Sequence, residues 1–273
     1  MPLRLGIASW TLPWSVGVAG YPQPERPLTA IGLVELASEI GATVVQIADN
    51  MPLHLMQPSE LRELSAAAAS RGIELQTGTR GVDPGHLLRY LDISDELGAK
   101  ILRTVGHISE TKPSIEQLAE CLAPVLHRFE AQGVAIALEN YEGHSAAEFA
   151  WLIREMNSPA LGICLDTANS LGGLETTEQV VEELAPHTIV LHAKDFEIVR
   201  IDTRMGFNVV GCPAGQGRVD FDFVLDRLSR YDRDPAAILE HWPPFVDSIG
   251  KTVELERRWL AASIEFLRRK GIG

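Results

Sequence analysis

Cysteine is scarce in this sequence. The 273 residues include three, Cys121, Cys164 and Cys212, and no two of them have CxxC spacing. The sequence therefore indicates neither a disulfide framework nor a cysteine zinc site. Cys164 lies inside the apolar run GICLD, where a small core residue is expected. Because proteins without disulfides are typical of a reducing compartment, we expect a cytoplasmic location.

Long apolar segments and an excess of positive charge are also missing. No run approaches the roughly 18 apolar residues of a membrane-spanning helix. The N-terminal MPLRLGIASW has the pattern of a strand and not that of a signal peptide. The formal net charge is −13, whereas proteins that bind phosphate backbones normally carry a basic stripe. We therefore expect neither a membrane nor a nucleic acid as partner.

Short apolar runs alternate with helical segments along the whole chain. A chain of this length fits one α/β barrel or two smaller domains. Alternation implies parallel strands joined by right-handed crossovers, and eight repeats favour a closed (β/α)8 barrel as a single domain over residues 1–273. An open doubly wound sheet is the alternative, but no GxGxxG follows the first strand and no P-loop is present. The predicted strands are RLGIASW, ATVVQIADN, IELQTGTRG, AKILRTVG, VAIALEN, LGICLDTAN, HTIVLHAKD and PAAILEH.

The last four predicted strands each end in a residue that can bind a metal. These residues are Glu139, Asp166, His192 and Glu240. In α/β barrels the functional residues lie at the carboxyl ends of the strands, so the four side chains can converge on one divalent cation. Three carboxylates and one imidazole suit Mn²⁺, Mg²⁺ or a similar ion better than a structural zinc.

Such an ion would have positions open for substrate oxygens. A ketone and its neighbouring hydroxyl can chelate there, and the ion then acts as a Lewis acid on a developing enediolate. Glu139 and Glu240 come from different strands. If each keeps one oxygen on the ion, its other oxygen is free to take or deliver a proton.

The strand ends LEN, LDTAN, LHAKD and LEH resemble those of the sugar phosphate isomerase/epimerase superfamily. The resemblance covers essentially the whole chain and includes the loop PAGQGRVDF. It implies a xylose-isomerase-like TIM barrel that binds one divalent cation, with Mn²⁺ preferred and Mg²⁺, Co²⁺ or Zn²⁺ as alternatives. It also implies Glu139, Asp166, His192 and Glu240 as metal ligands, with Glu139 and Glu240 as the acid/base pair.

Several positions differ from the ketose 3-epimerases of that superfamily. Those enzymes have a histidine where this chain has Asn169, and an arginine where it has Ile198, although Arg200 is near. In the dehydratase relatives, a lysine and an arginine that bind a substrate carboxylate match Lys194 and Arg103. Two cations near the metal would suit an acidic substrate. We therefore predict that Lys194, Asn169, Arg103 and Arg200 bind substrate.

Two long segments connect predicted elements. Residues 11–27, TLPWSVGVAGYPQPERP, should fold over the barrel mouth, because long ordered loops are often functional. Trp14, with Trp10 and Trp242, is a candidate wall of the substrate pocket. The insertion Phe196–Arg218 is expected to form a lid or a subunit contact, and a homo-oligomer is an open alternative.

The pattern predicts a metal-dependent isomerase or epimerase that acts on a keto sugar, with a small-molecule carbohydrate as its partner. The alternative is a metal-dependent lyase, a dehydratase or decarboxylase, that acts on an oxo sugar acid or an inosose-type ketone. A DNA-repair endonuclease of the same barrel type would need further histidines at the strand ends, where Asp49, Arg80 and Arg103 stand. A sugar-sensing module without catalysis is disfavoured by the complete ligand set.

Overall fold

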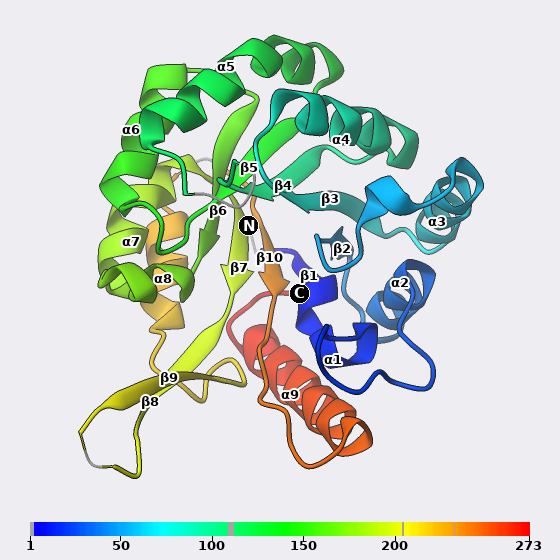
Figure 1. Ribbon diagram of the computed structural model, residues 1–273, viewed down its shortest axis with the longest axis vertical. Coiled ribbons are helices and arrows are strands. Elements are labelled where there is room, and N and C mark those ends of the chain that lie inside the picture. Colours follow the sequence, from blue (N-terminus) through cyan, green and yellow to red (C-terminus); the bar gives the residue numbers. More distant parts are fainter. Residues whose placement is uncertain (1–2, 109–111, 204, 232) are drawn as a thin grey trace.

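The computed structural model describes residues 3–108, 112–203, 205–231 and 233–273. The barrel strands are β1 (Leu5–Ala8), β2 (Val44–Ile47), β3 (Glu74–Arg80), β4 (Ile101–Val105), β5 (Ala135–Glu139), β6 (Leu161–Asp166), β7 (Thr188–Ala193) and β10 (Ala236–Leu239). They pair in parallel and close in the order β1-β10-β7-β6-β5-β4-β3-β2 (Figure 1). The predicted (β/α)8 barrel is confirmed.

Helices surround this barrel on the outside (Figure 1). They are α1 (Pro13–Val16), α2 (Ala30–Glu39), α3 (Pro58–Ser70), α4 (Pro84–Leu97), α5 (Ile115–Gln132), α6 (Ala146–Met156), α7 (Thr177–Leu184), α8 (Phe221–Leu228) and α9 (Ile249–Arg269). Several begin at a side-chain cap: Thr29 accepts a hydrogen bond from the backbone of Gly32, and Ser145 forms a capping box with Glu148. Within the described residues, no helix is long and apolar enough to cross a membrane.

The strand register aims the predicted ligands into the barrel. Successive side chains on a strand point to opposite faces, so residues two apart share a face. Ala137 belongs to a small buried cluster that is separate from the larger core, and Glu139 follows it by two positions on β5. The same spacing relates Cys164 to Asp166, Val190 to His192 and Ile238 to Glu240. The barrel interior is therefore polar at the carboxyl ends of the strands, next to an apolar layer of mostly small side chains.

The predicted insertion contains an antiparallel hairpin of β8 (Asp195–Arg200) and β9 (Phe207–Cys212), which extends away from the barrel (Figure 1). Its base lies against the barrel mouth. A Cβ at Gly211 would lie 2.9 Å from the indole of Trp242, so glycine permits this close approach. After the hairpin, residues 213–219 fold back over Asp195. The buried carboxylate of Asp195 accepts hydrogen bonds from the backbone N–H groups of Phe196, Gly215, Gly217 and Val219.

Candidate metal centre and active site

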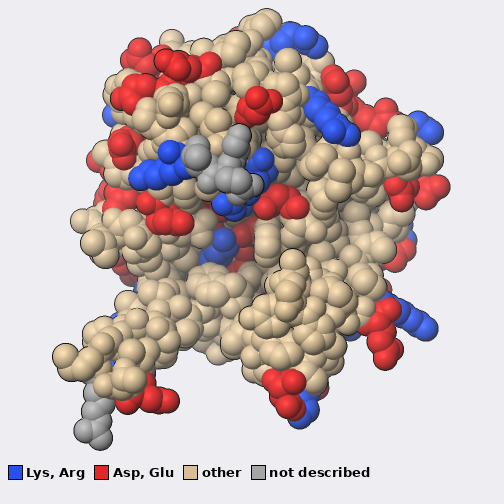
Figure 2. All heavy atoms as spheres, viewed as in Figure 1, with Lys and Arg blue, Asp and Glu red and all other residues tan. Residues whose placement is uncertain are grey.

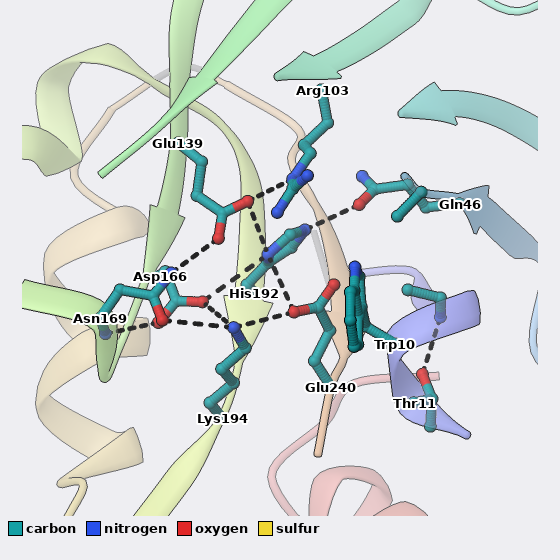
Figure 3. Close-up of polar contacts among 12 residues, drawn as sticks. Trp10, Thr11, Gln46, Arg103, Glu139, Asp166, Asn169, His192, Lys194 and Glu240 are labelled. Atoms are coloured by element: carbon teal, nitrogen blue, oxygen red, sulfur yellow. Dashed lines mark hydrogen bonds and ion pairs between the residues drawn. The ribbon is translucent and has the colours of Figure 1, made fainter. Parts of the chain in front are cut away.

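The four predicted ligands meet inside the mouth of the barrel (Figure 3). One atom from each of Glu139, Asp166, His192 and Glu240 lies within 4.8 Å of the others, and all four side chains are buried. Nδ1 of His192 lies 3.5 Å from Glu139 Oε2, 3.7 Å from Asp166 Oδ2 and 3.4 Å from Glu240 Oε2. These separations are compatible with bonds of about 2.0–2.2 Å from each atom to one shared ion.

Three atoms of the cluster are buried without a hydrogen-bond partner among the described residues. They are Nδ1 of His192, Oε1 of Glu240 and Oδ2 of Asp166, the last of which is ion-paired with Lys194. Buried polar atoms in folded proteins are nearly always partnered, so each orphan calls for an explanation. A nitrogen lone pair and a carboxylate oxygen that point into the same buried space are the donors a divalent cation requires. The residues present therefore fit a bound metal.

The charges in the cluster are strongly coupled. Burial would raise the pKa of Glu139, but neighbouring cations, Arg103 first and His192 second, lower it well below its usual value. Burial would also lower the pKa of His192, yet the anionic groups around it raise that pKa well above its usual value. Those groups are the carboxylates of Glu240 and Glu139; the thiol of Cys164 beside the ring is neutral, because burial raises its pKa to about 11. The cluster as a whole attracts positive charge.

Lys194 supplies one such charge. It follows β7, and its Nζ lies 2.7 Å from Asp166 Oδ2 and 2.9 Å from Glu240 Oε2 (Figure 3). Burial opposes the charged ammonium, but the carboxylates of Asp166 and Glu240 raise the pKa of Lys194 further above its usual value. In turn, burial would raise the pKa of Asp166, and Lys194 lowers it. Lys194 therefore stays protonated, and its ammonium faces the predicted ligands.

Asn169 positions two ligands. Its side-chain amide donates a 2.7 Å hydrogen bond to Oε1 of Glu139. Its backbone N–H and that of Ala168 each donate at 2.8 Å to Oδ1 of Asp166, which leaves Oδ2 to face the cluster. The residue predicted to contact substrate therefore also orients the metal-binding side chains.

Arg103 points from β4 into the cluster and is buried. Its Nε donates to Oε2 of Glu139, and its guanidinium also donates at 3.1 Å to Oδ1 of Asp49 and to the carbonyl of Thr79. Trp10 donates its indole N–H to the same Asp49 oxygen at 3.0 Å. Arg103 was predicted to bind a substrate carboxylate, yet its closest partner is the protein's own Glu139.

His192 has a partner that lies far from it in the sequence. Its Nε2 lies 2.8 Å from Oε1 of Gln46, which comes from β2 on another side of the barrel. The available signal in the sequence was one polar residue inside the apolar run ATVVQIADN. Nothing in that local pattern shows which distant residue Gln46 meets.

A cavity of about 540 Å³ opens above the cluster. Figure 2 shows a hollow at the centre of this face, with charged atoms of both signs inside it. The volume is in the range of small-molecule sites. A groove of about 1170 Å³ between α2 and α9 is larger, but no comparable metal-binding cluster lies there in the described parts of the chain. The residues that line the smaller cavity include Trp10, Arg103, Asn169, Lys194, Val209 and Trp242.

Two predicted substrate-binding residues do not line this cavity. Trp14 is buried against Tyr21 and Phe245, and its indole N–H donates at 2.7 Å to the carbonyl of Pro243. Its place in the pocket wall is taken by the predicted Trp10 and Trp242. Arg200 lies exposed at the far end of β8, with its guanidinium 4.6 Å from the centre of the Phe207 ring. In a single chain, therefore, neither Trp14 nor Arg200 is placed to bind a substrate in this cavity, contrary to the prediction.

Comparisons with known proteins agree with the barrel fold. A family model described as xylose isomerase-like TIM barrel matches residues 34–270. The chain is 32% identical over 265 residues to a 3-oxo-isoapionate decarboxylase from Pectobacterium atrosepticum, covering 97% of this chain and 95% of that relative.

Solved structures share the fold at low sequence identity. The D-psicose 3-epimerase of Clostridium cellulolyticum H10, solved with D-tagatose, aligns with a TM-score of 0.73, 16% identity, and coverage of 99% of this chain and 100% of that one. A xylose isomerase-like TIM barrel protein from Mycobacterium smegmatis, solved in complex with magnesium, aligns with a TM-score of 0.67, 14% identity, and 97% coverage of each chain. At these identities the likeness supports the fold alone.

Proposed function

The chain belongs to the family of xylose isomerase-like TIM barrels, and within that family we propose that it is a divalent-metal-dependent lyase that decarboxylates a 3-oxo sugar acid. The observation that carries the proposal is the position of Lys194, whose ammonium lies 2.7 Å and 2.9 Å from two of the clustered carboxylates. A site of buried acids repels an acidic substrate unless a cation offsets the repulsion. The 32% identity to a decarboxylase of such an acid supports the same choice.

The metal would be held by Glu139, Asp166, His192 and Glu240, with Mn²⁺ preferred over Mg²⁺, Co²⁺ or Zn²⁺. When bound, it supplies Lewis-acid polarisation of the substrate's ketone oxygen. Lys194 would hold the departing carboxylate. Its single flexible ammonium can turn from Asp166 towards a substrate anion, because lysine acts as a mobile point charge.

Loss of CO₂ from a 3-oxo acid breaks the bond between C1 and C2, and the electron pair moves towards the ketone. The carbon that has lost CO₂ must then gain a proton. Glu240 is placed to relay this proton from the solvent of the cavity: its ionised carboxylate first takes up a proton and then passes it to the carbon, since its Oε1 has no hydrogen-bond partner among the described residues and its side chain lines the cavity. Arg103 and Asn169 would keep Glu139 fixed through their bonds to its two oxygens.

The second candidate is the isomerase or epimerase. It is favoured by the pair Glu139 and Glu240, which approach His192 Nδ1 to 3.5 Å and 3.4 Å and extend from different strands. Two such carboxylates can remove and return a proton beside a ketone. We prefer the lyase because Lys194 could offer a cation to a substrate carboxylate, which a neutral ketose would not need.

The two candidate reactions differ in whether the substrate loses a carbon atom as CO₂. The protein loaded with Mg²⁺ in D₂O would be given a panel of [1-¹³C] 3-oxo sugar acids and neutral ketoses and followed by NMR. Labelled CO₂ or bicarbonate, with one deuterium on the former C2, supports the lyase. Deuterium exchange into a neutral ketose with every carbon retained, and no CO₂ from any acid, supports the isomerase and overturns the lyase.

For the whole protein, we predict one domain over residues 1–273, a cytoplasmic location, a small carbohydrate as substrate and assembly into a homo-oligomer. For the insertion Phe196–Arg218, Val209 and the base of the hairpin at the cavity support a role in the pocket wall. A subunit contact through its exposed end stays a prediction.

A further inference from the structure

A chain of hydrogen bonds runs from the metal-binding histidine across the barrel interior. His192 Nε2 lies 2.8 Å from Gln46 Oε1, and the Gln46 amide donates at 3.1 Å to Gln76 Oε1. The Gln76 amide donates at 3.4 Å to Glu74, which is ion-paired with Arg4. Gln46 is 0% and Gln76 2% exposed. The chain therefore links the candidate metal site to a charged pair at the start of β3.

The negative charge of Glu74 fixes the direction in which these hydrogen bonds are donated. An ionised carboxylate only accepts hydrogen bonds, so Gln76 must turn its NH₂ towards Glu74 and its carbonyl towards Gln46. Gln46 must then turn its NH₂ towards Gln76 and its carbonyl towards His192. A flipped Gln46 amide would set carbonyl against carbonyl at one end. The two amide orientations are thus assigned by the network.

The acceptor that reaches His192 decides which ring nitrogen carries the proton. A histidine binds a metal as the neutral imidazole, which has one N–H, and opposite a carbonyl oxygen that N–H is at Nε2. Nδ1 then carries the lone pair. It is this atom that is buried without a hydrogen-bond partner in the described residues and lies 3.4–3.7 Å from three carboxylates.

We propose that Gln46 and Gln76 are positioning residues that transmit the direction set by Glu74 to His192, fix its Nε2–H tautomer and present Nδ1 to the metal. The inference rests on the proposed metal site. It also accounts for two amides in a barrel interior where apolar side chains would cost less to bury. In other metal sites, loss of the group that accepts a ligating histidine's second N–H weakens metal binding by about 10–100-fold.

The direct test compares Gln46→Leu with Gln46→Glu. Affinities for Mn²⁺ and Zn²⁺ would be measured by calorimetry, and the His192 tautomer by ¹⁵N NMR of the histidine-labelled, Zn²⁺-loaded protein. We expect Gln46→Leu to bind both ions about 10–100-fold more weakly and to lose the slowly exchanging Nε2 proton. Gln46→Glu keeps an acceptor for that proton and should retain most of the affinity. Affinity within twofold of wild type and an unchanged spectrum in Gln46→Leu would overturn the proposal.

A distal variant keeps the test decisive if Gln46→Leu fails to fold. Glu74→Gln touches none of the predicted ligands, yet it removes the charge that sets the direction. We expect a several-fold loss of affinity with an unchanged circular dichroism spectrum. Lys251→Met, at an exposed ion pair with Asp247, is the matched surface control and should bind normally.

The double variant Gln46→Glu/Glu74→Gln should reverse the direction of these hydrogen bonds. With a carboxylate at 46, Gln76 must turn its NH₂ inwards and its carbonyl towards position 74, where glutamine can donate and glutamate cannot. The double variant should therefore unfold at a higher temperature than Gln46→Glu alone. If the two changes shift the unfolding temperature additively, Glu74 does not set the orientation of the Gln46 side chain and the proposal is contradicted. Because the readouts are metal affinity, tautomer and coupling, they stand even if the protein does not decarboxylate the tested acids, whereas a wild-type protein that binds no divalent cation defeats both proposals.

Discussion

The ammonium nitrogen of Lys194 lies 2.7 Å from Oδ2 of Asp166, the oxygen that faces the predicted metal ligands. A metal bound by this oxygen would therefore share the carboxylate with lysine. Lys194 is one of the cations, with Arg103, that offset the charge of the buried acids. A metal held at Asp166 would supply part of that positive charge and would leave the ammonium free to meet a substrate anion in the cavity.

The first prediction concerns Lys194→Met. Without the ammonium, Asp166 and Glu240 lose a buried cation, and the metal-free protein should lose about 3 kcal/mol of unfolding free energy. With saturating Mn²⁺ the loss should be smaller, because the ion supplies the missing charge. By linkage, the variant must then bind Mn²⁺ more tightly than wild type. Chemical unfolding with and without Mn²⁺, together with calorimetry, checks this; equal losses in both conditions would show that lysine and metal do not compete.

The second prediction concerns Glu240→Gln, which preserves shape but removes the carboxylate proposed to take up and pass on the proton. At saturating metal, kcat should fall by about 10²–10⁴-fold, the usual contribution of a positioned acid or base. The matched control is Glu142→Gln, since Glu142 lines the same cavity but is not part of the metal-binding cluster. Steady-state kinetics at several Mn²⁺ concentrations separate weaker metal binding from slower chemistry. Near wild-type kcat in Glu240→Gln would remove this residue from the acid/base role.

The third prediction concerns Asp195→Ala. The change leaves four backbone N–H groups without their acceptor, those of Phe196, Gly215, Gly217 and Val219. Phe196 and Val219 are buried, whereas Gly215 is exposed and Gly217 is partly buried. A buried donor left unpaired costs about 1–3 kcal/mol, so the total loss should be about 3 kcal/mol. We expect early protease cleavage within residues 213–219. Glu197→Ala, which breaks an exposed ion pair with Arg218 and a hydrogen bond from the backbone N–H of Ile198, should destabilise the protein much less, because water can replace both contacts. A similar cost for both variants would contradict the assignment.

The fourth prediction is a pH dependence of stability. Burial raises the pKa of Glu256 to about 7 from an ordinary value of 4.5, although the backbone N–H groups of Trp14 and Ser15 donate to its carboxylate. A group whose pKa rises on folding contributes stability that is complete below the unfolded pKa and is lost as pH rises through the folded one. Between about pH 4.5 and 7, wild type should therefore lose up to about 3 kcal/mol relative to Glu256→Gln.

Urea unfolding at a series of pH values measures this difference. Groups that titrate in both proteins cancel in the comparison, whatever the absolute stability of the variant. Parallel curves for wild type and Glu256→Gln would show that Glu256 does not titrate in this range.

The sequence was sufficient to predict the barrel and the meeting of Glu139, Asp166, His192 and Glu240. Each of these residues ends an apolar strand run, and the period of two along a strand fixes the face on which it lies. Parallel strands in a closed barrel bring their carboxyl ends to one face. A helix cap such as Thr29 depends on residues within one turn, so helix starts can also be predicted from the sequence.

The tertiary structure decided what those side chains touch. Gln46 meets His192 across 146 positions of sequence, Arg103 is paired with Glu139, and Trp14 is covered by Phe245 instead of facing the pocket. Local periodicity gives the face of a strand on which a residue lies, but not its rotamer or its neighbour from a distant strand. Those depend on the register in which the barrel closes and on how its loops pack, and both are set by contacts between segments far apart in the chain.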